Sequence, residues 1–167
     1  MRDELAAFTA GLELDQLRSV AAEQLHVTVV FLGNVRDEAI ADLAGAMSDV
    51  TAREPAFRLE VLHARPAPER RPRMLWALLS PSEELARLSR ALHETARHAA
   101  PERARPLRGY PHITLARLRR PVPGLEPADL PLSARAFDVT ALQLIRSHLS
   151  QTGAHHEAIA TLALAAK

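Results

Sequence analysis

Residues 112–118 read HITLARL, a run in which a histidine and a threonine are separated by a single isoleucine. Side chains alternate between the two faces of a β-strand, so residues i and i+2 share one face and lie roughly 7 Å apart. A strand over this run therefore places His112 and Thr114 on a common face. The aliphatic residue between them points to the other face, where it can enter a core.

The same pattern occurs earlier in the chain. Residues 24–32 read QLHVTVVFL, and this β-branched, apolar composition predicts a second strand. His26 and Thr28 then share a face in the same way. If the two strands face each other across one groove, two imidazoles and two hydroxyls reach the same small ligand.

The remaining sequence predicts helices and strands in mixed order, which favours the α+β class with an antiparallel-rich sheet. Pro-rich loops separate these elements, and Gly153 is expected to form a turn between the last two strands. The helices are expected over 3–14, from Asp37 onward and over 82–98, and the further strands over 57–63, 74–79, 136–148 and 156–165.

Composition limits the class of protein. The chain has 167 residues, 47% of them hydrophobic and 25% charged, which indicates one soluble globular domain. A net charge of +1 argues against a nonspecific DNA-coating protein or a polybasic membrane binder, and leaves a local basic groove open. The absence of cysteine excludes disulfides, thiolate zinc sites, iron–sulfur clusters and cysteine nucleophiles.

Location and assembly follow from similar arguments. No apolar stretch approaches the ~20 residues of a membrane-spanning helix. The charged N-terminus, Met1 to Glu4, lacks the apolar core of a signal peptide. We therefore expect a cytoplasmic protein with no membrane partner, and a monomer.

The residue types of the two motifs suit acid–base chemistry at a phosphodiester. Imidazole titrates near pH 6.5, so one histidine can be protonated and act as general acid while the other is neutral and acts as general base. The hydroxyls of Thr28 and Thr114 can donate hydrogen bonds to non-bridging phosphate oxygens. Neither His26 nor His112 has an acidic neighbour at metal-ligand spacing, so we expect no metal and no cofactor.

Paired H-x-T-x motifs in a chain of this size resemble the 2H phosphoesterase superfamily. Within it, LHVTVVFLGNV at 25–35 and PLRGYPHITLARL at 106–118 resemble the RNA 2′,3′-cyclic phosphodiesterases, once called 2′-5′ RNA ligases. The two motifs are specific to the superfamily, and the residues around them point to this branch. The likeness covers most of the chain.

The resemblance implies one LigT-like domain over 1–167, with a bilobal α+β fold of two pseudo-symmetric lobes. Each lobe would be an antiparallel sheet with outer helices, and a central cleft would hold both motifs. The implied reaction opens an RNA or nucleoside 2′,3′-cyclic phosphate to a 2′-phosphomonoester without metal. His26 would protonate the leaving 3′ oxygen and His112 would activate water, although the reverse reaction exchanges these roles.

Three further residues have candidate roles. The family often uses an arginine at the position of Arg117 on its substrate, but strand parity places this residue on the face opposite His112 unless the strand bulges or ends there. Phosphate binding and a plain surface position therefore both stay open. Tyr110 could stack on a base or lie on the surface. Trp76 could also stack on a base, but it lies inside an apolar strand and is therefore expected in the core.

The sequence departs from the family pattern at both ends. Relatives usually begin with an apolar strand before the first helix, whereas Met1 here leads directly into Arg2-Asp3-Glu4-Leu5, so this strand is expected to be missing. Near the C-terminus, Ser147 and Gly153 fit the family pattern, but His156 stands where tyrosine is usual. The adjacent pair at 155–156 does not suggest a metal site, because neighbouring strand residues point to opposite faces.

Other functions remain open at this stage. The same chemistry could cleave or join 2′-5′ linkages. A non-catalytic module that binds RNA ends or nucleotides could dispense with one imidazole and keep the hydroxyls and Arg117. A metal-dependent hydrolase would lose its activity in the presence of a chelator.

Overall fold

Strand β6 (His112–Leu118) carries the second motif and lies inside a six-stranded sheet of the computed structural model. The strand order is β1 (Leu17–Ser19), β6, β4 (Met74–Leu79), β3 (Phe57–Ala67) and β7 (Leu130–Pro131), and β8 (Ala136–Val139) also pairs with β3. Neighbours along this path, from β1 to β7, are antiparallel. The α+β class with antiparallel sheets is thereby confirmed.

Two compact units divide the chain, and each is built from three separate segments. Unit 1 consists of Met1–Thr28, Leu59–Pro81 and Gly109–Phe137, and unit 2 of Val29–Arg58, Ser82–Arg108 and Asp138–Lys167. The structure describes residues 1–12, 17–68, 71–99, 104–106, 109–119, 130–133, 136–150 and 153–166. Both H-x-T motifs belong to unit 1.

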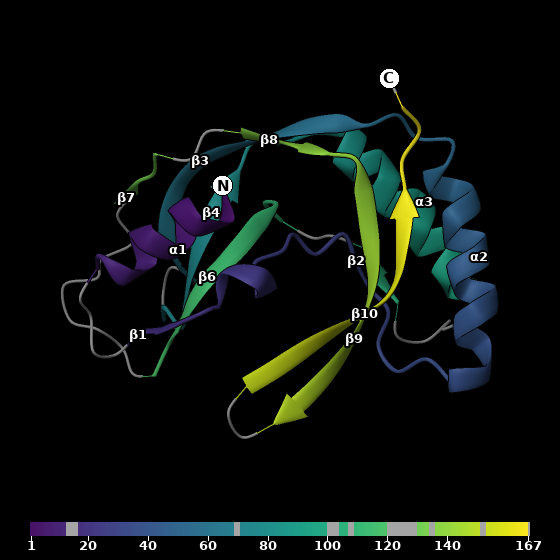
Figure 1. The fold of residues 1–167 in the computed structure, drawn as a ribbon, viewed down its shortest axis with the longest axis horizontal. Coiled ribbons are helices and arrows are strands. Elements are labelled where there is room, and N and C mark those ends of the chain that lie inside the picture. The colour runs from purple at the N-terminus through teal and green to yellow at the C-terminus, as the bar shows by residue number, and fades with distance from the viewer. Residues whose placement is uncertain are drawn as a thin grey trace. The chain divides into compact units, whose positions relative to one another are not determined.

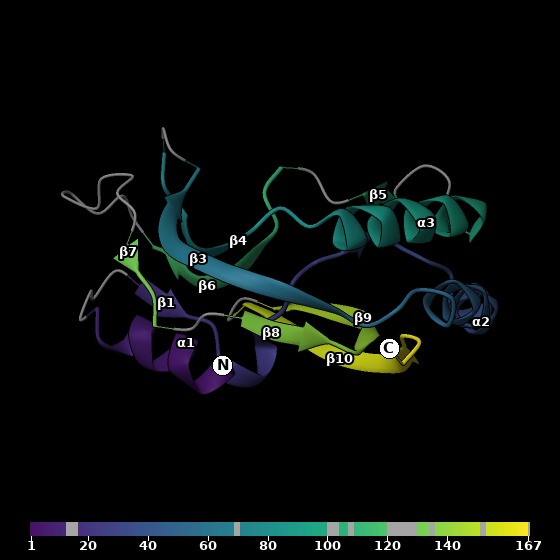
Figure 2. The same ribbon diagram turned by 90° about the horizontal axis from the view of Figure 1, so that it is seen from above.

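In unit 1, helix α1 (Arg2–Ala10) packs against β6 and β1 on one side of the sheet (Figure 2). Asp3 and Glu4 lie in its first turn, where negative charge complements the helix dipole. Helix α1 is the first element of the described chain. The sheet face that the helix shares consists of buried side chains: Ala64, Pro66, Leu75, Ala77, Ile113, Leu115, Ala116 and Leu118.

Unit 2 holds helices α2 (Ile40–Thr51) and α3 (Glu83–Ala99), which contact each other (Figure 1). Helix α2 also packs against strands β9 (Ala141–Ser150) and β10 (Gly153–Ala163). The hydroxyl of Ser82 accepts a hydrogen bond from the Leu85 amide and caps α3. The apolar stripe that α3 buries has helical spacing and consists of Leu85, Leu88, Leu92 and Ala96. Short 3₁₀ helices are η1 (Ala22–Gln24) and η2 (Asp37–Ala39).

The continuous strand predicted over 24–32 is wrong. The segment begins at the end of η1, forms one isolated bridge at Val27, and pairs regularly only in β2 (Val30–Phe31). Val27 bridges to β6 in unit 1, whereas β2 pairs with β5 (Arg105–Pro106) in unit 2. The segment changes partner where it leaves one unit for the other, so no single ladder runs along it.

Other boundaries also differ from the predictions. The first helix ends at Ala10, with Gly11 as its cap, and the predicted last residues of this helix lie partly outside the described residues. The strand predicted over 136–148 is two strands, β8 and β9, separated at Thr140. Gly153 is the first residue of β10, paired with Ser150, and is not the turn. Strands β4 and β6 have the predicted bounds.

Within the described part of the chain, no helix combines the length and the apolar character that crossing a membrane would require.

Candidate active site

The two motifs lie next to each other in unit 1. Val27 forms an antiparallel bridge with Ile113, the residue between the histidine and the threonine of the second motif. In an antiparallel pair, the residues on either side of such a bridge face each other crosswise. His26 is therefore opposite Thr114, and Thr28 is opposite His112. All four side chains therefore lie on one face of the sheet, as cross-strand neighbours.

Burial agrees with this arrangement. Leu25 and Ile113 are buried, whereas His26 and Thr28 are exposed. His112 and Thr114 are partly exposed. The strand alternation predicted from the sequence thus holds at both motifs, even though the first one is not part of a regular strand.

Each histidine is oriented by the backbone two residues before it. The Nδ1 atom of His26 lies 2.7 Å from the Gln24 carbonyl oxygen, and that of His112 lies 3.0 Å from the Tyr110 carbonyl oxygen. A carbonyl oxygen only accepts, so Nδ1 is the protonated nitrogen in both rings. When either imidazole is neutral, its Nε2 carries the free lone pair, and when it is charged, Nε2 can donate a proton.

The turn before β6 supports the second of these contacts. Gly109 has a φ of +72°, a backbone conformation that side-chain-bearing residues rarely adopt. It brings the chain around so that the Tyr110 carbonyl reaches the His112 ring. The Tyr110 side chain is 66% exposed, so its ring is accessible to a ligand.

Trp76 is not a core residue, contrary to the prediction. Its ring stacks on the His112 imidazole with centroids 3.8 Å apart and planes inclined by 18°. The register explains this position, since Trp76 pairs with Thr114 and therefore points to the motif face. Its Nε1 atom is buried and has no hydrogen-bond partner among the described residues. Because 74–79 is wholly apolar, the sequence offered no alternation from which to assign its faces.

Arg117 lies on the motif face because β6 bulges. Trp76 pairs with Thr114 and Leu75 with Ala116, which leaves Leu115 as an extra residue. One extra residue reverses the parity beyond it, and burial follows the reversal: Leu115 and Ala116 are both buried, whereas Arg117 is exposed. Simple alternation would have placed this arginine on the helix-covered face. The structure therefore selects the bulged alternative.

A second group of histidines lies on the β9–β10 hairpin in unit 2. His148 Nε2 lies 3.1 Å from a Glu157 carboxylate oxygen, and its ring centroid lies 6.5 Å from that of His155. The hydrogen bond from His148 lowers the pKa of the Glu157 carboxyl below its usual value of 4.5. The Nδ1 atom of His156 lies 3.1 Å from the Ser147 hydroxyl oxygen. The described residues contain no group of three or more His, Asp or Glu side chains placed to hold a metal ion.

Comparisons with known proteins agree with the motifs. The family model of the 2′-5′ RNA ligase superfamily matches residues 2–151. An RNA 2′,3′-cyclic phosphodiesterase of Archaeoglobus fulgidus is 28% identical over 140 residues, which are 82% of this chain and 78% of that protein. One of Thermus thermophilus is 28% identical over 141 residues, 81% of this chain and 70% of that protein.

Solved structures show the same fold. A crystal structure of a Thermus thermophilus protein matches with a TM-score of 0.82 and 24% identity, and covers 99% of this chain and 92% of that one. LigT of E. coli in complex with 3′-AMP matches with a TM-score of 0.76 and 26% identity, and covers 98% of this chain and 90% of that one. With a family model that spans nearly the whole sequence and with this shared fold, the chain belongs to the 2′-5′ RNA ligase superfamily, the two-histidine phosphoesterases that its motifs resemble.

Proposed function

We propose that this chain hydrolyses the 2′,3′-cyclic phosphate of an RNA end, or of a small nucleotide, to a 2′-phosphomonoester by two-histidine acid–base catalysis. The observation that carries the proposal is the paired setting of His26 and His112. Each ring is held by a carbonyl through Nδ1, and each lies across from the threonine of the other motif. Relatives with this activity in their names support the assignment of the substrate.

The reaction follows from this pairing. Neutral His112 takes a proton from water through Nε2 while the water oxygen forms a bond to phosphorus. The bond from phosphorus to the 3′ oxygen breaks, and protonated His26 donates its Nε2 proton to that oxygen. The products are a 2′-phosphomonoester and a 3′ hydroxyl. His112 is left protonated and His26 neutral, and exchange with solvent restores the starting states. The choice of donor and acceptor follows the family resemblance.

The other side chains of the motif face bind the substrate. Thr28 and Thr114 donate hydrogen bonds to the non-bridging oxygens, which hold the negative charge of the transition state. Arg117 on the same face attracts phosphate, and the exposed ring of Tyr110 offers a stacking surface for a base. None of these steps uses a metal ion, because the two imidazoles supply both proton transfers.

The test is hydrolysis of 2′,3′-cyclic AMP and of a cyclic-phosphate-ended oligoribonucleotide in EDTA. The wild type should release the 2′-phosphate product, and His26→Ala and His112→Ala should each lose on the order of 10²–10⁴ in rate, the usual contribution of general acid–base catalysis. His98→Ala is the matched control, since this exposed histidine lies on α3. A loss of less than tenfold would remove the substituted motif histidine from its role.

The other outcomes separate the alternatives. Activity that EDTA abolishes would indicate a metal hydrolase. Cleavage of a 2′-5′-linked dinucleotide in preference to the cyclic phosphate would indicate the linkage phosphodiesterase. A folded wild type that binds nucleotide without turnover would indicate a binding module.

A further inference from the structure

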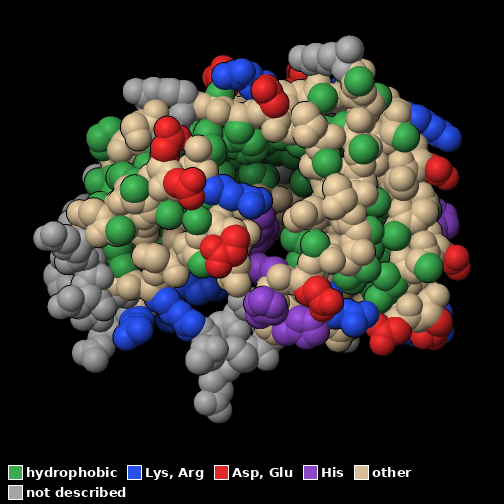
Figure 3. Space-filling model, in the orientation of Figure 1, with side chains coloured by type: hydrophobic (Ala, Val, Ile, Leu, Met, Phe, Trp, Pro, Cys, Tyr) green, Lys and Arg blue, Asp and Glu red, His purple; other side chains and the backbone are tan. Residues whose placement is uncertain are grey.

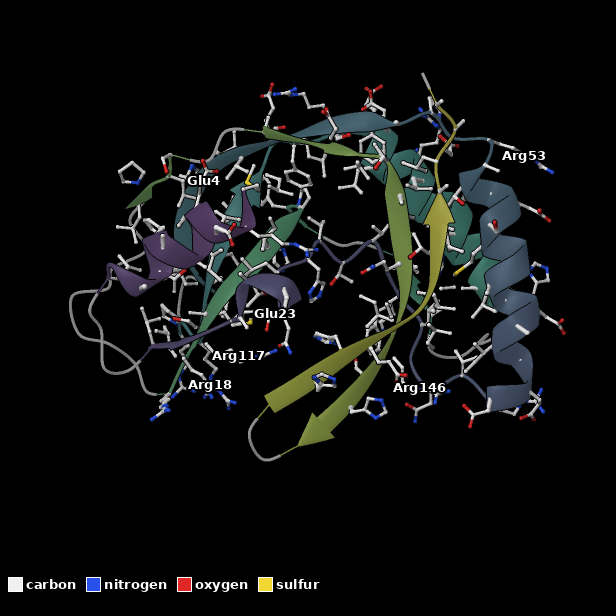
Figure 4. The ribbon with its side chains drawn as sticks, viewed as in Figure 1. Glu4, Arg18, Glu23, Arg53, Arg117 and Arg146 are labelled. Atoms are coloured by element: carbon white, nitrogen blue, oxygen red, sulfur yellow. The ribbon has the colours of Figure 1, made fainter. Side chains whose placement is uncertain are left out.

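Two arginines lie directly opposite each other at one end of the motif sheet. Arg18 of β1 pairs with Arg117 of β6 in the antiparallel register, and both side chains are exposed. Figure 4 shows them together at the same end of the two strands, and Figure 3 shows arginine side chains gathered at the corresponding place on the surface. Like charges in directly opposite positions repel each other and destabilise the pairing.

Among the described residues, no acidic side chain pairs with either arginine to compensate this repulsion. Neither Arg18 nor Arg117 makes a hydrogen bond or an ion pair through its side chain within the part of the chain that the structure describes. Glu23, which lies nearby in Figure 4, forms no ion pair with either of them. Two neighbouring guanidinium groups that have no counter-ion among the described residues form a site for an anion, and a guanidinium binds phosphate oxygens in a two-pronged geometry.

The pair is aligned with the catalytic histidines. Because Leu115 is the extra residue of the bulge, Thr114 and Arg117 are successive members of the motif face of β6. One strand repeat separates them, roughly 7 Å. A phosphate held by the two threonines would therefore have the arginine pair as its neighbour along the strand, about one nucleotide step away. The chain carries a net charge of only +1, so this attraction is local and does not extend over the whole surface.

We propose that Arg18 and Arg117 together bind the phosphodiester that precedes the cyclic phosphate in an RNA chain. This inference rests on the proposed function and specifies its substrate: an oligoribonucleotide end, which supplies two phosphates, is preferred over a mononucleotide, which supplies one. The bound phosphodiester removes the repulsion between the two guanidinium groups. Arg18 is the new member of the site. Nothing in its sequence neighbourhood distinguishes it from the other arginines, and only its pairing with Arg117 assigns it a role.

The experiment compares two substrates that differ by one phosphodiester, 2′,3′-cyclic AMP and the dinucleotide ApA ending in a 2′,3′-cyclic phosphate. The measured quantity is the ratio of kcat/KM for the dinucleotide to kcat/KM for the mononucleotide. The wild type should favour the dinucleotide, and Arg18→Gln should lower the ratio about tenfold, the effect of losing one charge-assisted hydrogen bond. Raising the salt concentration should lower the wild-type ratio as well, because it weakens phosphate contacts.

Arg53→Gln is the matched control, since it removes the same charge from an exposed position just beyond α2. It should keep the wild-type ratio. An unchanged ratio in Arg18→Gln, or a wild type that does not favour the dinucleotide, overturns the subsite and leaves the proposed function intact. If the wild type hydrolyses neither substrate, the proposed function fails. In that case, the subsite is tested by measuring the equilibrium affinities for ApA 3′-phosphate and for 3′-AMP. If the ratio of these two affinities is the same in the wild type and in Arg18→Gln, the subsite is overturned.

Discussion

At the scale of single residues, the two catalytic candidates, His26 and His112, are held by the same kind of local contact with the backbone. In both motifs the carbonyl two residues before the histidine contacts Nδ1 and thereby fixes the tautomer, which makes Nε2 the nitrogen that exchanges the catalytic proton. The contact uses only backbone atoms, so it places no demand on the residue types at Gln24 and Tyr110.

The pH dependence of turnover should reflect the protonation states of His26 and His112. We expect a bell-shaped profile of kcat/KM, because one imidazole must be protonated and the other neutral at the same time. His26→Ala and His112→Ala should each remove one limb of the profile from the residual activity. A profile that is flat from pH 5 to 9 in the wild type would contradict the mechanism.

Trp76 should act as a positioning residue for His112. When His112 takes its proton, it becomes a cation lying on the face of the indole ring, an interaction of about 0.5–2 kcal/mol. Trp76→Leu should therefore lower kcat roughly 2- to 30-fold with little change in KM. Trp76→Phe retains an aromatic face and should recover most of kcat. An equal loss in both variants, or a change confined to KM, would show that the stacking serves packing alone.

At the scale of elements, the bulge in β6 decides which side chains join the site. It turns Arg117 toward the motifs and at the same time keeps Leu115 and Ala116 in the core under α1. A regular strand could not do both. One bulge thus keeps the apolar side chains of the strand buried and the charged side chain exposed on the opposite face.

The β9–β10 hairpin should show a pH-dependent stability. The hydrogen bond from His148 lowers the pKa of Glu157. The contribution of this hydrogen bond to the free energy of unfolding is therefore present above the usual pKa of 4.5, and it is lost as the pH falls through the lowered pKa. His148→Gln should therefore be less stable than the wild type at pH 5, and the difference should shrink as the pH falls below 4.5. Urea unfolding midpoints at several pH values measure it, with Glu157→Gln as the partner variant. A difference that is constant over this range would contradict the linkage.

At the scale of the whole molecule, the two units are interleaved along the chain. Three segments make up each unit, so the chain passes from one to the other five times, after residues 28, 58, 81, 108 and 137. Neither unit is a continuous piece of sequence. Strands β3 and β8 also continue across these boundaries. We therefore expect the units to fold together as one cooperative system.

A destabilising core substitution in unit 2 should also lower the unfolding temperature that is measured by a fluorescent residue in unit 1. Leu88→Ala removes a fully buried side chain of α3 and should cost about 2–5 kcal/mol. Trp76, the single tryptophan of the sequence, reports unit 1 by fluorescence. The thermal unfolding midpoint followed by Trp76 fluorescence should fall together with the midpoint followed by far-ultraviolet circular dichroism. Both should fall by roughly 2–4 °C for each kcal/mol of unfolding free energy that is lost.

The control for this experiment is Leu62→Ala, since Leu62 is 44% exposed and should change stability little. A fluorescence midpoint that stays at the wild-type value while the dichroism midpoint falls would show that the two units unfold independently.

The sequence by itself determined the family, the α+β class, the bounds of β4 and β6, and the four motif residues. The family follows from the resemblance of the two motifs, and the other features depend on local rules: the composition of strands and the alternation of side chains across them. Only the tertiary structure decided the pairing of the motifs through Val27 and Ile113, the break in the segment over 24–32, and the faces of Trp76 and Arg117. Each of these depends on which strand lies alongside and in which register, and strand pairing joins residues that are far apart in the chain.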